Sequence, residues 1–303
     1  MADEMKGKKI LVTGATGQVG FPFALHHVKD NEVWAVARFN DTEKRAALEA
    51  AGIHCQVVDL AEGNFGDLAQ DFDYVFHFAV ARIDGDDFDL DMRSNAEATG
   101  LLMSYCRNAK AFFHCSTTGV YEANGHEVFT ELSPLGDNHR CMMPTYSIGK
   151  IAVESVVRFC ARDYNLPTVI CRLNTPYGES GWPFYHLMMM QHGIEIPIHS
   201  DGPSEYTLFH QDDINRLAPK MLSAASVPAE TFNFSGQEHV SVEDWCAYIA
   251  ELSGLTPKFK ATADTLESVK TDNSKMLAVT GPALVDWRDG IRRMVEAAGA
   301  IKA

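Results

Sequence analysis

The sequence has no apolar run near the roughly 18–20 residues that a membrane-spanning helix needs, so no membrane partner is expected. Residues 1–9 are polar and lead directly into a glycine-rich stretch, which is not the pattern of a secretory signal. The predicted location is therefore the cytoplasm. The seven cysteines form no Cys-x-x-Cys pair and no His/Cys spacing typical of a metal site, so we expect reduced thiols and no bound metal.

An excess of basic residues is also missing. The 303 residues contain 26 Lys and Arg against 41 Asp and Glu, which gives a formal net charge of −15. Binding to a phosphate backbone needs a basic footprint, so nucleic acid is not an expected partner. An anionic cofactor is still compatible with this charge, because backbone amides at a helix N-terminus hold phosphate locally. The expected partner is a small-molecule substrate.

The chain lacks internal repeats and low-complexity linkers. Its first 175 residues alternate short apolar runs with helical patterns. The apolar runs predict strands at 10–13, 33–37, 55–58, 74–78, 111–115 and 168–172, and the helical patterns predict helices at 17–28, 42–51, 87–108 and 146–164. Alternation of this kind predicts an α/β fold with a doubly wound parallel sheet.

Beyond residue 175 the pattern loosens, and Gly, Pro, His and Met become frequent. A helix at 212–225 and a strand at 231–234 are expected to return to the large domain. We therefore predict a Rossmann-type domain over residues 1–175, to which 208–235 returns. The remaining segments, 176–207 and 236–303, would form a small, discontinuous C-terminal substrate lobe.

Three glycines follow the first predicted strand, with the spacing Gly14-x-x-Gly17-x-x-Gly20. Gly14 permits a tight turn, Gly17 lets a pyrophosphate approach the backbone, and Gly20 lets the following helix pack closely on the sheet. The N-terminus of that helix presents free N–H groups and positive dipole character to the phosphates. Because a strand precedes the glycines and a helix follows them, the pattern predicts dinucleotide binding.

The end of the second predicted strand bears on the choice of cofactor. An acidic residue there would bind the ribose 2′-hydroxyl of NAD, but the position is Arg38. A guanidinium suits a 2′-phosphate, so we favour NADP over NAD, although a plain surface arginine is the alternative. Asp59, after the third strand, is placed to meet the adenine edge or simply to cap the next segment.

Tyr146 and Lys150 lie four residues apart at the start of a predicted helix, so their side chains share one face. A free tyrosine, with a pKa of about 10, is a poor acid or base at neutral pH. A neighbouring ammonium favours the phenolate and brings the pKa towards the working range. The pair therefore indicates an acid/base function, and a solvated helix pair is the plainer alternative.

A hydroxyl that holds the substrate oxygen is expected at the carboxyl end of the fifth strand, where ligands bind in open α/β sheets. Ser116, Thr117 and Thr118 occupy this place. We select Thr117, with its two neighbours as alternatives. Hydroxyls at strand ends often bond to local backbone, so Thr117 gains its weight from Tyr146 and Lys150.

At this point the sequence resembles the extended short-chain dehydrogenase/reductase family, of the NAD-dependent epimerase/dehydratase type. Seven segments match in order, from the start of the chain to about residue 235: the Gly14/Gly17/Gly20 turn, Val58-Asp59-Leu60, Phe76-His77-Phe78-Ala79, Ser116-Thr117 with Val120-Tyr121, Tyr146 to Lys150, Arg172-Leu-Asn174-Thr-Pro-Tyr177-Gly178, and Phe209-His210-Gln-Asp212-Asp213-Ile214.

The resemblance implies a Rossmann fold, Tyr146 as acid/base, Lys150 as its activator and Thr117 as the donor to the substrate oxygen. Asn95 resembles the family's asparagine in the long helix and joins the catalytic set. A homodimer through helices 87–108 and 146–164 is also implied. The expected cofactor-binding residues are Gly14, Thr16, Gly17, Gln18, Val19, Gly20, Arg38, Asp59, Leu60, Phe78, Ala79, Val80, Ser116, Tyr146 and Lys150.

The chain departs from the family in the substrate lobe. Nucleotide-sugar members usually carry an arginine four residues before His210 that binds the substrate diphosphate, and here that residue is Tyr206. Met and aromatic residues are frequent between 182 and 190, which suits an apolar or aromatic substrate, or else a helix core. The expected pocket residues are Thr118, Asn174, Tyr177, Trp182, Met189 and Tyr206.

Three functions fit these patterns. The leading hypothesis is an NAD(P)-dependent oxidoreductase that transfers hydride at a carbonyl or secondary alcohol. The alternative is an epimerase or dehydratase that oxidises its substrate transiently, although dehydratases usually carry an acidic pair next to the catalytic hydroxyl, where this chain has Thr118 and Gly119. A non-catalytic NADP-sensing regulator is a remote third, because such relatives typically lose the Tyr/Lys pair.

Overall fold

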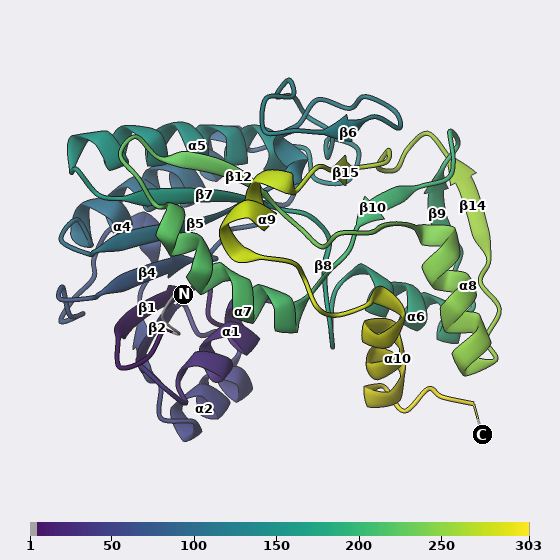
Figure 1. The fold of residues 1–303 in the computed structure, drawn as a ribbon, viewed down its shortest axis with the longest axis horizontal. Helices are drawn as coiled ribbons and strands as arrows, with labels where there is room; N and C mark the ends of the chain where they lie inside the picture. Colours follow the sequence, from purple (N-terminus) through teal and green to yellow (C-terminus); the bar gives the residue numbers. More distant parts are fainter. Residues whose placement is uncertain (1–4, 303) are drawn as a thin grey trace.

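The computed structural model describes residues 5–302, and its centre is a seven-stranded parallel sheet (Figure 1). The strand order β12-β7-β5-β4-β1-β2-β3 reverses direction next to β1, as in a Rossmann fold, so the predicted fold class is confirmed. The strands are β1 (Lys9–Thr13), β2 (Glu32–Ala37), β3 (His54–Val57), β4 (Tyr74–His77), β5 (Ala111–Thr117), β7 (Thr168–Leu173) and β12 (Glu230–Phe234).

The central strands are apolar on both sides because helices cover both faces of the sheet. Every residue of β5 and β7 is buried. One hydrophobic core, which includes Phe23, Phe76 and Phe113, lies on one face, and a second, which includes Phe112 and Val157, lies on the other. A continuous apolar run in the sequence was therefore a good predictor of these strands.

Two layers of helices enclose the sheet (Figure 1). The long pair α4 and α5 packs together on one face, and α1 packs with α7 on the other. The helices of these layers are α1 (Gly20–His27), α2 (Thr42–Ala50), α3 (Phe88–Asp91), α4 (Ala98–Tyr105), α5 (Tyr146–Asp163), α7 (Gln211–Met221) and α9 (Ser274–Thr280).

The predicted helix at 87–108 is interrupted in the structure. A π-helical turn, Met92–Glu97, separates α3 from α4, and it packs against α5. Such turns are rare and often occur at functional sites. The sequence pattern did not indicate it, because one extra residue per turn barely changes the apolar periodicity.

A second group of elements lies beside the sheet, at the right of Figure 1. The helices α6 (Trp182–His192), α8 (Val242–Ser253) and α10 (Trp287–Ala297) share a third hydrophobic core around Trp245. Short strand pairs complete this region: β8 (Pro176–Tyr177) with β11 (Phe209–His210), β9 (Ile196–His199) with β14 (Phe259–Thr262), β10 (Glu205–Thr207) with β13 (His239–Ser241), and β6 (Val128–Phe129) with β15 (Lys270–Thr271).

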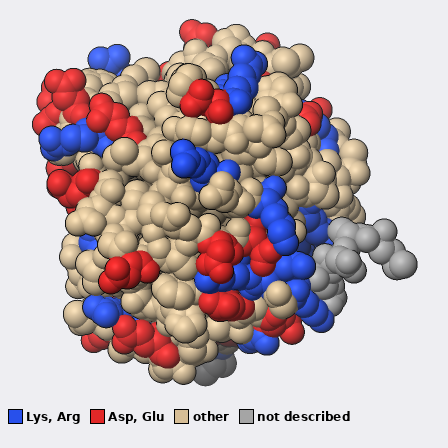
Figure 2. Space-filling view, turned by 90° about the vertical axis from the view of Figure 1, so that its left-hand side faces the viewer, with Lys and Arg blue, Asp and Glu red and all other residues tan. Residues whose placement is uncertain are grey.

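Acidic and basic side chains lie interspersed on the face that Figure 2 shows, with broad uncharged areas between them. All seven cysteines are free, and five of them are buried. Among residues 5–302, no helix combines the length and the apolarity required to cross a membrane.

One buried ion pair joins α5 to the sheet. The Arg172 guanidinium, on β7, donates to both carboxylate oxygens of Glu154, on α5, at 2.9 and 2.7 Å. The Ser116 hydroxyl donates to the same carboxylate at 2.6 Å. Glu154 and Arg172 are almost fully buried, so each charge depends on the other for its stabilisation.

The variant Glu154→Gln is expected to lower the free energy of unfolding by about 3–5 kcal/mol, because it leaves the Arg172 charge buried without a counter-charge. The matched control is Glu49→Gln, which breaks an exposed Glu–Arg pair of similar distance on α2 and should leave unfolding nearly unchanged. Urea unfolding followed by circular dichroism measures both. Equal effects in the two variants would contradict this account of the buried pair.

Candidate active site

Tyr146 and Lys150 lie in the first two turns of α5, which contacts β5 near its carboxyl end. The Lys150 ammonium is buried and donates to the Cys115 carbonyl at 3.1 Å. Burial lowers the pKa of Lys150 and raises the pKa of Tyr146. A hydrogen bond with Thr117 and the charge of Arg82 oppose the rise for Tyr146. Sequence reasoning had not identified Arg82.

Thr117 is the last residue of β5, and its hydroxyl oxygen accepts the Gly119 N–H at 3.0 Å. Its interaction with Tyr146, and the Lys150 hydrogen bond to the Cys115 carbonyl, place the predicted hydroxyl, phenol and ammonium at the same strand end. The two rival hydroxyls turn elsewhere: Ser116 donates to Glu154, and Thr118 donates to the Leu173 carbonyl at 3.5 Å. The hydroxyl protons of Ser116 and Thr118 are therefore engaged within the protein, unlike the expectation for both residues.

A buried carboxylate braces the start of α5. Asp91 accepts hydrogen bonds from the Thr145 hydroxyl at 2.6 Å and from the Asn95 amide at 3.0 Å. A Cβ at Gly149 would lie only 2.0 Å from Asp91 Oδ1, so this close approach requires glycine at position 149. Asp91 and Thr145 were not predicted, since nothing in the local sequence marks residues 54 positions apart as partners.

Asn95 lies in the π-helical turn and holds the segment that follows β4. Its side chain accepts the Ala81 N–H at 2.7 Å and donates to the Ala81 carbonyl at 2.9 Å. Both ends of the amide are thus engaged with backbone. The geometry makes Asn95 a positioning residue for the loop at the sheet edge.

A histidine that sequence reasoning missed lies beside the catalytic cluster. The ring centroids of His139 and Tyr146 are 5.4 Å apart, with the planes tilted by 42°. His139 Nδ1 forms a short hydrogen bond with Asn138 Oδ1. Burial lowers the pKa of His139 to about 4, so the ring is neutral near pH 7. A lone histidine in a predicted loop carries no sequence signal for this position.

The glycine turn between β1 and α1 is closely packed at two of its three glycines. Gly14 has φ +68°, and a Cβ there would lie 2.7 Å from the Ala79 amide nitrogen. A Cβ at Gly20 would lie 2.4 Å from the Gly14 carbonyl oxygen, whereas Gly17 meets only that same oxygen, at 3.1 Å. No side chain caps the first turn of α1. These features fit a phosphate-bearing cofactor, because the helix N–H groups remain available.

The remaining turn residues connect to neighbouring elements. The Gln18 amide donates to the Pro176 carbonyl at 2.9 Å, and Gln211 donates to the Val19 carbonyl at 3.3 Å. The Thr16 carbonyl accepts the Lys44 ammonium at 2.8 Å. Next to this turn, the segment after β4 places Phe78 against the core at the sheet edge, followed by Ala79 and Val80 with partial exposure.

Arg38, Asp59 and Leu60, which were expected to contact the cofactor, differ in how the structure uses them. Arg38 follows β2 and is exposed, with no ion pair within residues 5–302. Asp59 caps a 3₁₀ turn by accepting the Ala61 N–H at 3.0 Å, which is the plainer of its two expected roles. Leu60 is half-buried against the second core. Of the two charged residues, Asp59 is engaged with backbone, and the Arg38 guanidinium has no ion-pair or hydrogen-bond partner among residues 5–302.

Several predicted pocket residues are structural. Asn174 donates to the Val269 carbonyl at 2.9 Å, and the Tyr177 hydroxyl donates to the Trp287 carbonyl at 3.5 Å. Tyr206 is 3% exposed, with its hydroxyl bonded to the Leu266 carbonyl and its ring 5.0 Å from Trp182. All three side chains are buried and have a hydrogen-bond partner within the protein. Trp182 and Met189 are half-buried against the third core.

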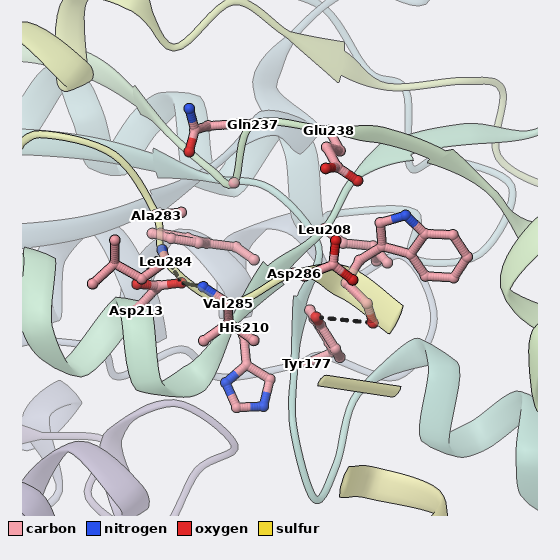
Figure 3. A pocket seen from close by; sticks show the side chains of 13 residues that line it. Tyr177, Leu208, His210, Asp213, Gln237, Glu238, Ala283, Leu284, Val285 and Asp286 are labelled. Carbon is pink, nitrogen blue, oxygen red and sulfur yellow. Dashed lines mark hydrogen bonds between the residues drawn. The ribbon is translucent and has the colours of Figure 1, made fainter. Parts of the chain in front are cut away.

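A cavity of about 230 Å³ lies on another side of the chain, between β8, β11 and the connection from α9 to α10 (Figure 3). Tyr177, His210 and Asp286 line it, but none of Thr117, Tyr146 and Lys150 does. The Asp213 carboxylate in its wall accepts the Leu284 and Val285 amides and is therefore used structurally. Among residues 5–302, no group of three or more His, Cys, Asp or Glu is placed to hold a metal ion.

Comparisons with known proteins agree with this geometry. A model of the NAD dependent epimerase/dehydratase family matches residues 10–234, which contain the glycine turn and the catalytic cluster. The chain is 26% identical over 268 residues to an uncharacterized UDP-glucose epimerase of Bacillus subtilis, with 81% of this chain and 82% of that protein covered. It is 28% identical over 161 residues to dTDP-glucose 4,6-dehydratase of Neisseria gonorrhoeae, covering 50% of this chain and 45% of that protein.

Solved structures share the fold across the chain. A UDP-glucuronic acid 4-epimerase from Bacillus cereus, in complex with NAD and a fluorinated UDP-sugar, superposes with a TM-score of 0.83 at 23% identity, covering 95% of this chain and 98% of that chain. A UDP-glucose 4-epimerase from Thermotoga maritima, in complex with UDP-glucose, gives a TM-score of 0.79 at 21% identity, covering 96% and 98%. At these identities the likeness shows the fold alone.

The variant Lys150→Met is expected to raise the free energy of unfolding by about 1–2 kcal/mol, because it replaces a buried ammonium by an apolar chain of similar length. The difference in the free energy of unfolding between the variant and the wild type should shrink as pH rises towards 10.5. Because the pKa of Lys150 is lower in the native than in the unfolded protein, the native state loses the charge at a lower pH. Thermal unfolding over a pH series measures it, with exposed Lys29→Met as the control. A destabilised Lys150→Met at neutral pH would contradict the assigned cost of this charge.

Proposed function

The chain belongs to the NAD-dependent epimerase/dehydratase family and is an enzyme, and we propose that it oxidises a secondary alcohol transiently and reduces the product again within one catalytic cycle. The observation that carries the proposal is the convergence of Thr117, Tyr146 and Lys150 at the carboxyl end of β5. The alcohol would belong to a sugar-like substrate, as the names of the relatives suggest.

Each residue of the cluster has one task in this proposal. Tyr146 accepts the proton of the substrate hydroxyl and returns it at the end of the cycle. Lys150 would add its positive charge at the same strand end, beside the Arg82 charge and the Thr117 hydroxyl that oppose the rise in the pKa of Tyr146. Thr117 receives the Gly119 N–H on its oxygen, and its own proton, which interacts with Tyr146 in the free protein, would turn to the substrate oxygen. Asn95 keeps the loop after β4 in place.

A nicotinamide dinucleotide would supply the hydride acceptor and donor. Gly14, Gly17 and Gly20 would admit its pyrophosphate, and the uncapped first turn of α1 would donate to it. Phe78, Ala79 and Val80 border the same sheet edge. Solved relatives are in complex with NAD, which favours NAD in this chain, whereas the exposed Arg38 favours a 2′-phosphate.

A net oxidoreductase that acts on a small apolar or aromatic substrate is the second candidate. Its specific support is Tyr206, which stands where nucleotide-sugar members carry a diphosphate-binding arginine and is buried in this chain. Arg38 adds support, because a guanidinium suits the 2′-phosphate of NADP. A net reductase that uses NADPH releases its cofactor in each turnover. A non-catalytic NADP sensor has no support from a site that keeps Tyr146 and Lys150.

We also propose that segments 176–207 and 236–303 form the substrate lobe and that the chain forms a homodimer through α4 and α5. Exposed apolar side chains on these two helices support the second point: Leu101 is 43% exposed and Phe159 is 63% exposed. A contiguous apolar patch across the two helices would be typical of an interface.

The variant Tyr146→Phe is expected to lower turnover by at least about 10²-fold, because it removes the phenol that would transfer the proton beside Thr117. Binding of NADH, followed by its fluorescence, should be unchanged. Turnover is measured as the conversion of UDP-glucose, UDP-glucuronate and dTDP-glucose to an epimerised or dehydrated sugar, separated by chromatography. The control is Tyr164→Phe at the other end of α5. Retained activity in Tyr146→Phe would exclude Tyr146 as the acid/base.

The variant Arg38→Ala is expected to weaken NADPH binding at least about tenfold and to leave NADH binding unchanged, because only NADPH carries the 2′-phosphate that the guanidinium would meet. Fluorescence titration with the two cofactors measures the difference. Arg45→Ala, on the neighbouring helix α2, controls for a general loss of positive charge. Equal losses for both cofactors would contradict the assignment of Arg38.

A further inference from the structure

The glycine turn presents backbone N–H groups at Gln18, Val19 and Gly20 that have no partner in the described part of the chain. Two side-chain amides hold these same residues in place. Gln211, at the start of α7, donates to the Val19 carbonyl at 3.3 Å, and Gln18 itself donates to the Pro176 carbonyl at 2.9 Å. Because a peptide group is planar, fixing the Val19 carbonyl also fixes the N–H of Gly20. The phosphate-binding donors are therefore oriented by contacts outside the turn.

The hydrogen bond between Gln18 and Pro176 spans the carboxyl edge of the sheet. Gln18 follows β1 and Pro176 follows β7, and the strands β4 and β5 lie between these two in the sheet. Neighbouring strands are about 4.8 Å apart, so the two segments together bridge roughly 14 Å between strand ends. A dinucleotide that extends from the glycine turn to Tyr146 lies along this same edge. The hydrogen bond therefore closes one side of the path by which such a ligand leaves.

Glycine at position 181 is required for this contact. Its φ is +104°, and a Cβ there would lie 2.8 Å from Gln18 Nε2 and 2.4 Å from the Pro176 carbonyl oxygen. Gly181 immediately precedes α6, and the loop before it is closed by the Gly178 N–H, which donates to the Ser180 carbonyl at 3.1 Å. This loop starts at β8, which lies between the central sheet and α6 (Figure 1). The hydrogen bond thus joins the glycine turn to the proposed substrate lobe.

We propose that Gln18 retains the dinucleotide in the site from one turnover to the next. Its side chain fastens the phosphate-binding turn to the loop that leads into α6, and the cofactor leaves only when this hydrogen bond opens. The inference rests on the proposed function, because only a cofactor that is regenerated within the cycle can stay bound between turnovers. Gln18 touches no reacting atom with its side chain. It is a positioning residue, and its effect lies in the rate of cofactor release.

The rate of cofactor release tests this inference. The protein is freed of any bound nucleotide, loaded with NADH or NADPH, and mixed with excess NAD or NADP in a stopped-flow instrument. Release is followed by the fluorescence of the bound reduced cofactor. Gln18→Ala is expected to release it about tenfold faster than the wild type and to leave the association rate constant within about twofold, because the lost hydrogen bond holds only the bound state. An unchanged release rate in Gln18→Ala overturns the inference.

Further variants assign the effect to the contact. Gly181→Ala should speed release by a similar factor, since its Cβ meets the amide of Gln18. The double variant should release the cofactor no faster than the faster single variant, because both changes break the same hydrogen bond. Gln191→Ala, which changes an exposed glutamine on α6, is the matched control. Additive effects in the double variant, or faster release in Gln191→Ala, overturn the role of this contact.

Hydrogen exchange in the nucleotide-free protein tests the contact itself. Peptides that cover residues 177–185 report the Gly178 and Tyr185 amides, which are bonded within the loop and the first turn of α6. Gln18→Ala should speed the exchange of these amides, and Gln191→Ala should not. Unchanged exchange in Gln18→Ala shows that the loop is held without Gln18 and overturns the inference.

Release is measured without turnover, so its outcome is separate from that of the proposed function. Faster release in Gln18→Ala, together with unaltered turnover in Tyr146→Phe, supports the role of Gln18 and contradicts the proposed function. Normal release in Gln18→Ala, together with lost turnover in Tyr146→Phe, overturns the role of Gln18 alone. A wild type that binds neither NADH nor NADPH overturns both.

Discussion

The buried ammonium of Lys150 is the constraint on which the rest of the site depends. Its hydrogen bond to the Cys115 carbonyl requires the first two turns of α5 to lie on the carboxyl end of β5. That position brings Tyr146 to Thr117. Burying a charge costs stability, so other contacts must hold the helix there. Asp91 pressed against Gly149 and the Glu154–Arg172 pair one turn further along provide them.

The same side of the sheet carries other polar groups at a cost to stability. His77 is bonded through both ring nitrogens, to Thr13 at 2.7 Å and to Thr99 at 2.9 Å. His114 lies fully buried 5.4 Å from His77, and neither of its ring nitrogens has a partner within residues 5–302. Burial lowers its pKa strongly, so the ring stays neutral. A polar interior beneath the active site is typical of enzymes in which part of the stability is given up for function.

The fold was predictable because its strands are buried on both faces and therefore read as apolar runs, as in Ala111 to Thr117. The cluster of Thr117, Tyr146 and Lys150 was predictable because strand ends and helix turns have a fixed geometry. Side-chain direction was not predictable where tertiary partners decide it. Ser116 turns to Glu154, and Tyr206 enters a core that also holds Trp245, a residue far along the chain. His139 was missed because only the folded loop brings it to Tyr146.

The central claim is that oxidation in this enzyme is transient, and the identity of any bound nucleotide tests it most directly. The purified protein is denatured with acid or heat, and the released nucleotide is identified by chromatography and compared in amount with the protein. The account predicts NAD that remains bound through purification, because a cofactor that is reduced and reoxidised in one cycle has no need to leave. Protein that emerges empty and binds NADPH reversibly would contradict it and establish a net reductase.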